Sequence, residues 1–174
     1  MKILSIKKTA AIVSAIVFAL LASGCMGKSI VVPQNQPISE PMSKVVDGIE
    51  IDWNQINSDC VALLDKSEYP YGKKIDFIMD PDAGMVGLAW MVDDACTYED
   101  APAYAEGFIK AFNDAMATQD FKYAISGENY YGGVFDIYGC EVYVFHEADQ
   151  DNPEKYLVAQ VVAPGSNEPI VPNK

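Results

Sequence analysis

A run of eight residues, Met85–Val92, contains no polar side chain and constrains the fold more than any other segment. It follows Asp80–Gly84, which indicates a turn because proline fixes φ and glycine permits positive φ. A short apolar run bounded by a turn is typical of a strand buried on both faces. Residues 74–80, on the other side of the turn, alternate apolar and polar side chains as a half-buried strand does. The two segments therefore predict a β-hairpin.

Two helices are predicted, one on each side of this hairpin. Asp52 is a candidate N-cap with Gln55 three residues later, and apolar residues recur at helical spacing over 53–66. A second capping pattern begins at Thr97, and an apolar stripe with the helical period follows over 101–118. Each stripe predicts a helix that buries one face against another element.

Four further segments have strand character. They are 121–125, 134–138, 140–146 and 155–163, with Gly139 as a tight turn or a bulge between the second and the third. Short links between successive strands favour antiparallel neighbours. We therefore expect an α+β domain, in which an antiparallel sheet of four to six strands carries two helices packed on one face.

The first 25 residues have the pattern of an export signal. Lys2, Lys7 and Lys8 form a basic start, the uncharged run Thr9–Ala22 follows, and small residues precede Cys25. The uncharged run is shorter than the roughly 20 residues that a helix needs to cross a bilayer. This block, with the sequence LASGC, resembles the signal peptide and lipobox of bacterial lipoproteins. An uncleaved membrane anchor and a plain secreted protein are the alternatives.

The resemblance implies a position for the whole protein. It implies cleavage before Cys25, acyl chains such as palmitate on Cys25, and export across the inner membrane. The folded part is then anchored to the cell membrane or the outer membrane and faces the periplasm or the exterior. The membrane, through this lipid, is the first expected partner.

The chain is expected to hold one domain between two irregular segments. Residues 1–24 are the predicted signal peptide, and residues 25–46 combine the lipidated cysteine with a flexible tether rich in proline, asparagine, glutamine and serine. Residues 47–165 are the predicted α+β domain. Residues 166–174 predict a disordered tail.

Charge excludes one class of partner. The chain has 25 acidic residues against 12 lysines, contains no arginine, and carries a formal net charge of −13. Nucleic-acid binding needs a basic patch that neutralises phosphates, so we expect no nucleic-acid partner. An acidic surface attracts cations or basic partners, although it also simply keeps a protein soluble.

Cysteine and histidine give little support to catalysis or metal binding. Cys60, Cys96 and Cys140 allow one disulfide in any of three pairings, or three reduced core thiols. They lack zinc-ligand spacing, and the carboxylates of the hairpin turn lack calcium-loop spacing, so no metal or cofactor is expected. His146 is the only histidine, and it is six residues from Cys140, about 20 Å along a straight strand. A nucleophile and its base need contact at about 3 Å.

Tyrosine is the enriched residue type, with ten in the chain. Aromatic side chains on loops provide a large contact area at a low entropic cost, and they also seal the ends of a core. The candidate binding residues are the five tyrosines at predicted loops and turns, Tyr69, Tyr71, Tyr130, Tyr131 and Tyr138.

These observations favour a membrane-anchored module that binds a protein, peptide or glycan of the cell envelope. No nucleophile–base pair or metal cluster is recognisable, which favours binding over catalysis. Two alternatives stay open. One is a cell-envelope hydrolase that uses paired carboxylates as acid and base. The other is a structural subunit of an envelope assembly that joins its partners by strand addition.

Overall fold

The computed structural model describes residues 42–64 and 67–173. The predicted signal peptide, Cys25 and most of the predicted tether lie outside the described residues. No helix among the described residues is long and apolar enough to cross a membrane. The elements, in chain order, are β1 (Val45–Val46), β2 (Ile49–Glu50), α2 (Trp53–Leu63), β3 (Gly72–Asp80), β4 (Met85–Val92), α3 (Ala101–Gln119), α4 (Gly133–Ile137), β5 (Gly139–His146), the 3-10 turns η1 (Glu147–Asp149) and η2 (Pro153–Lys155), and β6 (Val158–Val162).

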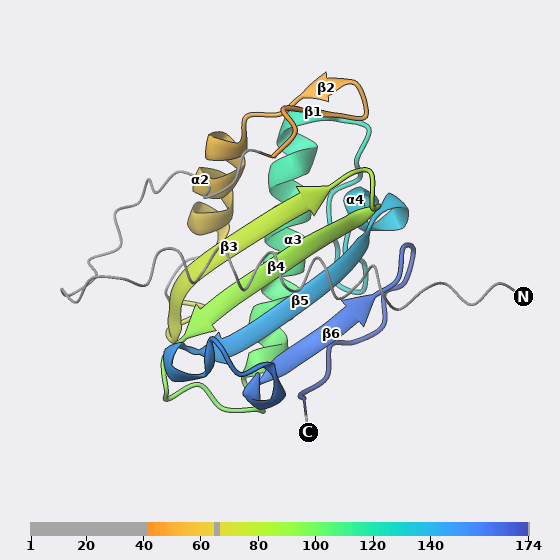
Figure 1. Ribbon diagram of the computed structural model, residues 1–174. Helices are drawn as coiled ribbons and strands as arrows, with labels where there is room; N and C mark the ends of the chain where they lie inside the picture. The colour runs from red at the N-terminus through yellow and green to blue at the C-terminus, as the bar shows by residue number, and fades with distance from the viewer. Residues whose placement is uncertain (1–41, 65–66, 174) are drawn as a thin grey trace, which may run out of the picture.

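The domain is a four-stranded sheet with helices on one side, which confirms the predicted α+β class (Figure 1). The strand order is β3-β4-β5-β6. The hairpin β3–β4 and the pair β5–β6 are antiparallel, as expected. The central pair β4–β5 is parallel, so the sheet is mixed rather than wholly antiparallel. Helix α3 lies behind the middle of the sheet and α2 packs beside it (Figure 1).

The prediction of a strand at 134–138 is wrong, and the parallel pair is a consequence of the structure that forms there instead. This segment forms the short helix α4, so the chain reaches β5 through helices and enters it parallel to β4. Gly132, with φ of 105°, turns the backbone into α4. The first helical N–H groups need a partner, and the side chain of Asn113 in α3 supplies one: its Oδ1 accepts from Val134 N at 3.0 Å.

Two other strand predictions also differ from the structure. Residues 121–125 form a turn and an irregular segment instead of a short strand, and Phe121 is 90% exposed there. The predicted strand 155–163 is shorter, because Lys155 ends the turn η2 and β6 begins at Val158. Helix α2 also ends at Leu63, before the predicted limit of residue 66.

The domain extends beyond both of its predicted boundaries. On the N-terminal side, Val46 is buried, and the turn between β1 and β2 uses Asp47 and Gly48 with positive φ, a common hairpin pair. On the C-terminal side, the predicted disordered tail packs on the domain, because Ile170 is only 5% exposed. Gln160 of β6 holds this segment through Val171 N, which donates to its Oε1 at 2.9 Å.

The helix starts follow the sequence closely. Asp52 caps α2 by accepting from two backbone N–H groups, as predicted. The reciprocal half of the capping box is absent, because the backbone N–H of Asp52 donates to Gln119 Oε1 of α3 at 2.8 Å instead. Before α3, Asp100 Oδ2 accepts from Thr97 N at 3.1 Å, and Thr97 Oγ1 accepts from Asp100 N at 3.3 Å. Side-chain capping therefore sets the start of α2, whereas the Thr97–Asp100 bonds order the turn before α3, whose N-cap Asp100 makes no side-chain cap bond.

The core lies between α3 and the sheet. Trp90 and Phe77 of the hairpin meet Phe108 and Phe112 of α3, with ring centroids 5.9 Å and 5.2 Å apart respectively. Both phenylalanines of α3 are fully buried. Helix α3 packs on both β4 and β5 and so covers the central parallel pair.

Asn113 is the one polar side chain of α3 that is fully buried, and it joins three segments. Besides capping α4, its Nδ2 donates to Ala124 O at 3.0 Å. We predict that Asn113→Ala lowers the free energy of unfolding by about 2 kcal/mol, because buried donors and acceptors lose their partners. Urea denaturation measures this. The exposed Asn54→Ala is the control, and it should stay within about 0.5 kcal/mol of the parent. An equal small effect in both variants would contradict the bridging role of Asn113.

Candidate binding site

The sheet has a second face that none of the helices within residues 42–64 and 67–173 covers, which we call the helix-free face. Alternate side chains of each strand point to opposite faces. Val142 and Val144 of β5 belong to the main core with α3, whereas Tyr143 and Phe145 form a separate cluster with Ala89. The helix-free face is defined here by Asp76 and Ile78 of β3, Gly87, Ala89 and Met91 of β4, and Glu141, Tyr143 and Phe145 of β5.

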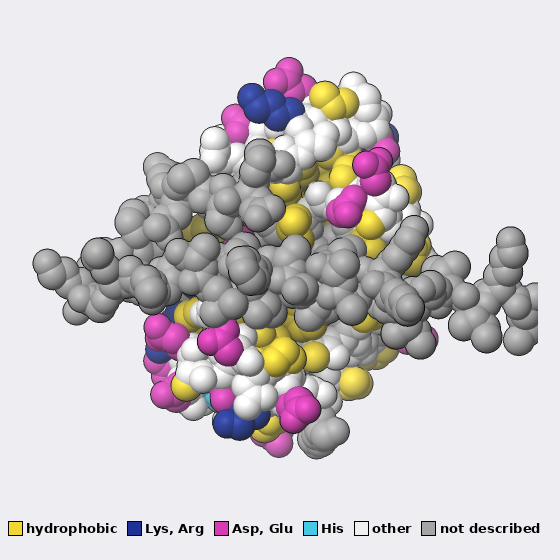
Figure 2. Space-filling view, in the orientation of Figure 1, with side chains coloured by type: hydrophobic (Ala, Val, Ile, Leu, Met, Phe, Trp, Pro, Cys, Tyr) yellow, Lys and Arg dark blue, Asp and Glu magenta, His cyan; other side chains and the backbone are white. Residues whose placement is uncertain are grey.

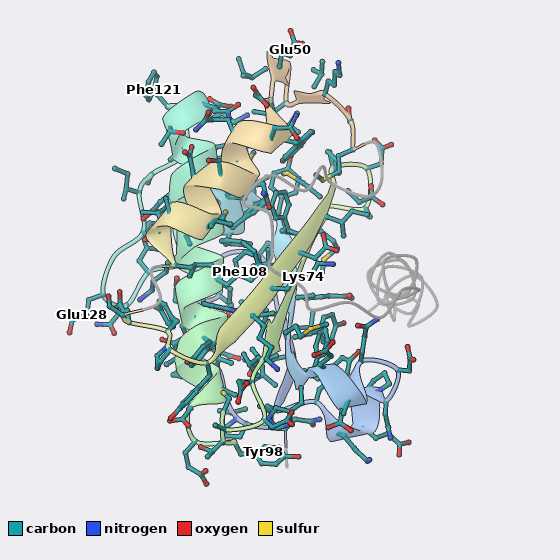
Figure 3. All side chains as sticks on the ribbon, turned by 90° about the vertical axis from the view of Figure 1, so that its left-hand side faces the viewer. Glu50, Lys74, Tyr98, Phe108, Phe121 and Glu128 are labelled. Atoms are coloured by element: carbon teal, nitrogen blue, oxygen red, sulfur yellow. The ribbon has the colours of Figure 1, made fainter. Side chains whose placement is uncertain are left out.

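Figure 2 looks onto this face, since the helices lie behind the sheet in the same orientation. Where Figure 2 leaves this face visible, hydrophobic side chains gather on it, and acidic side chains lie nearer its edges. From the side, the helices stand on one side of the sheet, and the loop with η1 and η2 lies on the other, at one end (Figure 3). The face is therefore mostly apolar with carboxyl groups among its side chains, its central residues Ala89, Glu141, Tyr143 and Phe145 are buried, and a loop bounds it at one end.

Glu141 is the most unusual residue of this face. It is 0% exposed, although it is an acid in the middle of the apolar strand β5. Its Oε2 accepts from the hydroxyl of Tyr143 at 3.1 Å. Its Oε1 is buried and has no hydrogen-bond partner. Burial raises the pKa of Glu141, and the hydrogen bond from Tyr143 lowers that pKa by a smaller amount.

A second carboxyl group lies two strands away on the same face. Asp76 of β3 pairs with Ala89, which pairs with Tyr143 of β5. Burial raises the pKa of Asp76, while Lys74 and the N–H of Phe77 lower it. Two strand spacings and a two-residue offset put the Cα atoms of Asp76 and Glu141 about 12 Å apart.

The strand between these two acids has small side chains at this level. Gly87 lies beside Glu141 in the parallel register, and Ala89 lies beside Tyr143. No bulky side chain of β4 therefore stands between Asp76 and Glu141 on this face.

Aromatic side chains close one end of the face. Tyr156, just before β6, stacks on Phe145 with ring centroids 4.7 Å apart and meets Tyr143 edge-on at 5.9 Å. Its hydroxyl donates to Gln150 O at 2.7 Å, which holds the loop in place. Burial raises the pKa of Tyr156 to about 12, so this phenol remains a neutral donor at physiological pH.

The five predicted binding tyrosines do not form one surface. Tyr69 and Tyr71 are half-buried and both pack on Tyr104 of α3, with centroids 5.2 Å and 6.4 Å away. Tyr131 is buried, and its hydroxyl donates to the backbone carbonyl of Glu168 in the C-terminal segment. Their contacts are those of side chains that seal the ends of the core.

The other two predicted tyrosines also have partners within the domain. The half-buried Tyr130 donates its hydroxyl to the carboxylate of Asp136. Tyr138 is buried, and it hydrogen-bonds to Asp47 of the β1–β2 turn. Asp47 also accepts from Lys122 Nζ at 2.9 Å, which lowers the pKa of Asp47. Tyr138 therefore helps to fasten the small hairpin to the rest of the domain.

All three described cysteines are free and buried. Burial raises the pKa of Cys96 to about 11 and raises the pKa of Cys60 and Cys140 as well. These thiols are therefore protonated at neutral pH, whereas a nucleophilic cysteine needs a thiolate. Their places in the structure match the open alternative of three reduced core thiols.

His146 lies near Cys96, but the contact is not that of a catalytic pair. Its Nε2 is 2.9 Å from the backbone carbonyl oxygen of Cys96. A carbonyl oxygen only accepts, so Nε2 carries the proton and donates it. His146 therefore ties the end of β5 to the segment before α3. Among the described residues, no group of three or more histidine, cysteine, aspartate or glutamate side chains is placed to hold a metal ion.

Sequence reasoning missed Glu141 and Asp76 as site residues. The available signal was Glu141 itself, a single acid inside the apolar run Cys140–Phe145. In the sequence, Asp76 is only the polar member of the alternating segment 74–80. Comparison of this chain with protein-family models, curated proteins and solved structures finds no match.

The burial of the Glu141 carboxyl group leads to a prediction about how the stability of the domain depends on pH. Because the folded pKa of Glu141 is raised above its unfolded value, ionisation at rising pH destabilises the folded state. Glu141→Gln removes this ionisation and keeps the acceptor for Tyr143. We expect the variant to be more stable than the parent by about 1–3 kcal/mol at pH 8, and the gap to close below about pH 4.

Thermal unfolding across this pH range measures the effect. The exposed Glu128→Gln is the matched control, and its difference from the parent should stay small and independent of pH. A Glu141→Gln variant that is less stable at pH 8 would show that the carboxylate has a stabilising partner.

Proposed function

We propose that this protein is a lipid-anchored extracytoplasmic binding module that uses the helix-free face to hold a component of the cell envelope. The observation that carries the proposal is the buried Oε1 atom of Glu141, which lacks a hydrogen-bond partner on an apolar face. An unpaired buried acceptor costs free energy, so a donor supplied by a ligand would recover it. The resemblance of residues 1–25 to a lipoprotein signal supports the membrane anchor.

Assembly by strand addition is less well supported, because both edges of the sheet have local partners. On β3, Phe77 N donates to Asp76 Oδ1 at 3.0 Å, and Met79 N donates to Met42 Sδ at 3.3 Å. On the β6 side, the C-terminal segment covers the edge, since Asn173 N donates to Leu157 O at 2.9 Å. Occupied edges are a known protection against pairing with another chain.

A cell-envelope hydrolase is the second candidate. Asp76 and Glu141 share a face, and burial raises both pKa values, as a general acid requires. Glycoside hydrolysis needs the two carboxyl groups about 5–9.5 Å apart. The roughly 12 Å between the Cα atoms is compatible with such a pair only if both side chains lean toward Gly87.

The anchor has a direct test. We predict that Cys25→Ser abolishes acylation and moves the protein from the detergent phase to the aqueous phase, because the lipid supplies the membrane affinity. Intact-mass analysis measures acylation, and detergent partitioning measures the location. Cys96→Ala is the matched cysteine control and should remain acylated. Full membrane association of Cys25→Ser would support an uncleaved anchor instead.

The binding face has a second test. We predict that soluble peptidoglycan fragments or envelope peptides shift the methyl NMR signals of Ile78, Ala89 and Met91 in the chain from residue 26 onward. Met91→Lys should weaken this binding by about tenfold or more, because a charge enters an apolar contact. Val61→Lys, on the outer side of α2, is the matched control and should bind as the parent does.

Three outcomes separate the candidates. Shifts confined to the helix side of the domain, or no shifts with any fraction, would contradict the proposed site. New reducing ends that appear during the titration, and that disappear in Glu141→Gln, would identify the hydrolase.

A further inference from the structure

The geometry around Glu141 restricts the chemistry of a ligand. The hydroxyl of Tyr143 donates to Oε2 and so orients the carboxyl group, which leaves Oε1 as a buried acceptor without a hydrogen-bond partner. A fully buried acceptor needs a donor that is small enough to reach it. The neighbouring side chains are apolar or aromatic, so the rest of such a ligand would lie against Ala89 and Tyr143.

Charge favours a cationic donor over a neutral or an anionic one. A buried carboxylate is stabilised most by a cation, and charge-assisted hydrogen bonds are about twice as strong as neutral ones. A second carboxyl group, that of Asp76, lies on the same face, and the whole chain carries a net charge of −13. The ring of Tyr143 adds a surface that attracts cations. An anion would meet repulsion from both acids.

We propose that the helix-free face binds a small organic amine, whose ammonium group donates to Glu141 Oε1 and whose apolar body lies over Gly87 and Ala89. This inference rests on the proposed function, because it names the ligand chemistry of the same face. A small amine fits better than a bulky cation, because the acceptor atom is fully buried. A metal ion is less suited, because hard cations take six or more oxygen ligands and this site offers one unpaired carboxylate oxygen.

Binding of a cation to the ionised carboxyl should depend on pH. Tyr143 contacts Glu141 directly, and the other titratable groups on this face are Tyr156 from the segment before β6 and Asp76 and Lys74 on β3. Beside Glu141, strands β4 and β6 present only Gly87 and Val161, which do not titrate. Burial raises the pKa of both tyrosines, which therefore stay protonated at neutral pH, so the carboxyls control the pH profile in the acidic and neutral range.

Three probes with similar apolar bodies and different charges test the proposal: 2-phenylethylammonium, 2-phenylethanol and 3-phenylpropionate. Each is titrated into the chain from residue 26 onward, and NMR follows the signals of Ala89 and Tyr143. We expect the cation to bind about tenfold or more tightly than the alcohol, and the anion not to bind. The affinity for the cation should rise between pH 5 and pH 8, where this probe itself stays charged.

Variants assign the effect to one carboxyl group. Glu141→Gln should reduce the affinity for the cation to that for the alcohol, and it should remove the pH dependence of binding. Asp76→Asn should give a smaller loss. The exposed Glu128→Gln removes the same charge from elsewhere in the chain and should leave all three affinities unchanged.

Equal binding of the alcohol and the cation, or full binding of the cation by Glu141→Gln, would overturn the proposal. So would shifts from the cation that lie away from Ala89 and Tyr143. If peptidoglycan fragments or envelope peptides shift the face while the amine does not, the proposed function stands and the ligand chemistry proposed here is wrong. If neither shifts the face, both proposals fail.

Discussion

Strand β4 is apolar on both sides, yet helices cover only one side of the sheet, and much of the structure follows from this imbalance. Val86, Leu88 and Trp90 face α3 and complete the main core. Their neighbours along the strand face the other way, where burial depends on side chains from the sheet itself and on the loop that carries Tyr156. A sheet that faces water on one side normally alternates apolar and polar residues. The departure from that rule at β4 and β5 distinguishes the helix-free face from an ordinary solvated surface.

The parts of the fold that could be predicted are those that neighbouring residues determine. Asp52 caps the helix that begins one residue later, and Asp80–Gly84 turns the chain between two strands with local chemistry alone. The unbroken apolar run Met85–Val92 predicts a central strand because only a position covered on both faces suits it. Each of these signals acts within a few residues, so one sequence is enough to show it.

The remaining parts depend on partners far away in the chain. Residues 134–138 have apolar character that fits a strand, but Asn113 caps them as a helix from 21 residues away. Polar composition suggests disorder after residue 165, whereas Ile170 is buried and its backbone N–H meets the carboxylate of Glu106 in α3. The candidate site also depends on residues that are far apart in the chain. No local pattern shows that Gly87 lies beside Glu141 or that Asp76 lies two strands away, because the strand registers determine both.

The packing of residues 166–173 on the domain has a consequence for the order in which the domain folds during synthesis. These residues follow every strand of the sheet in the chain, so they are synthesised after β6. Until they arrive, the backbone carbonyl of Leu157 beside β6 lacks the N–H of Asn173, and the place of Ile170 in the core is empty. Folding during synthesis therefore ends with this segment, and the incomplete domain is the state in which a chaperone would most benefit the nascent protein.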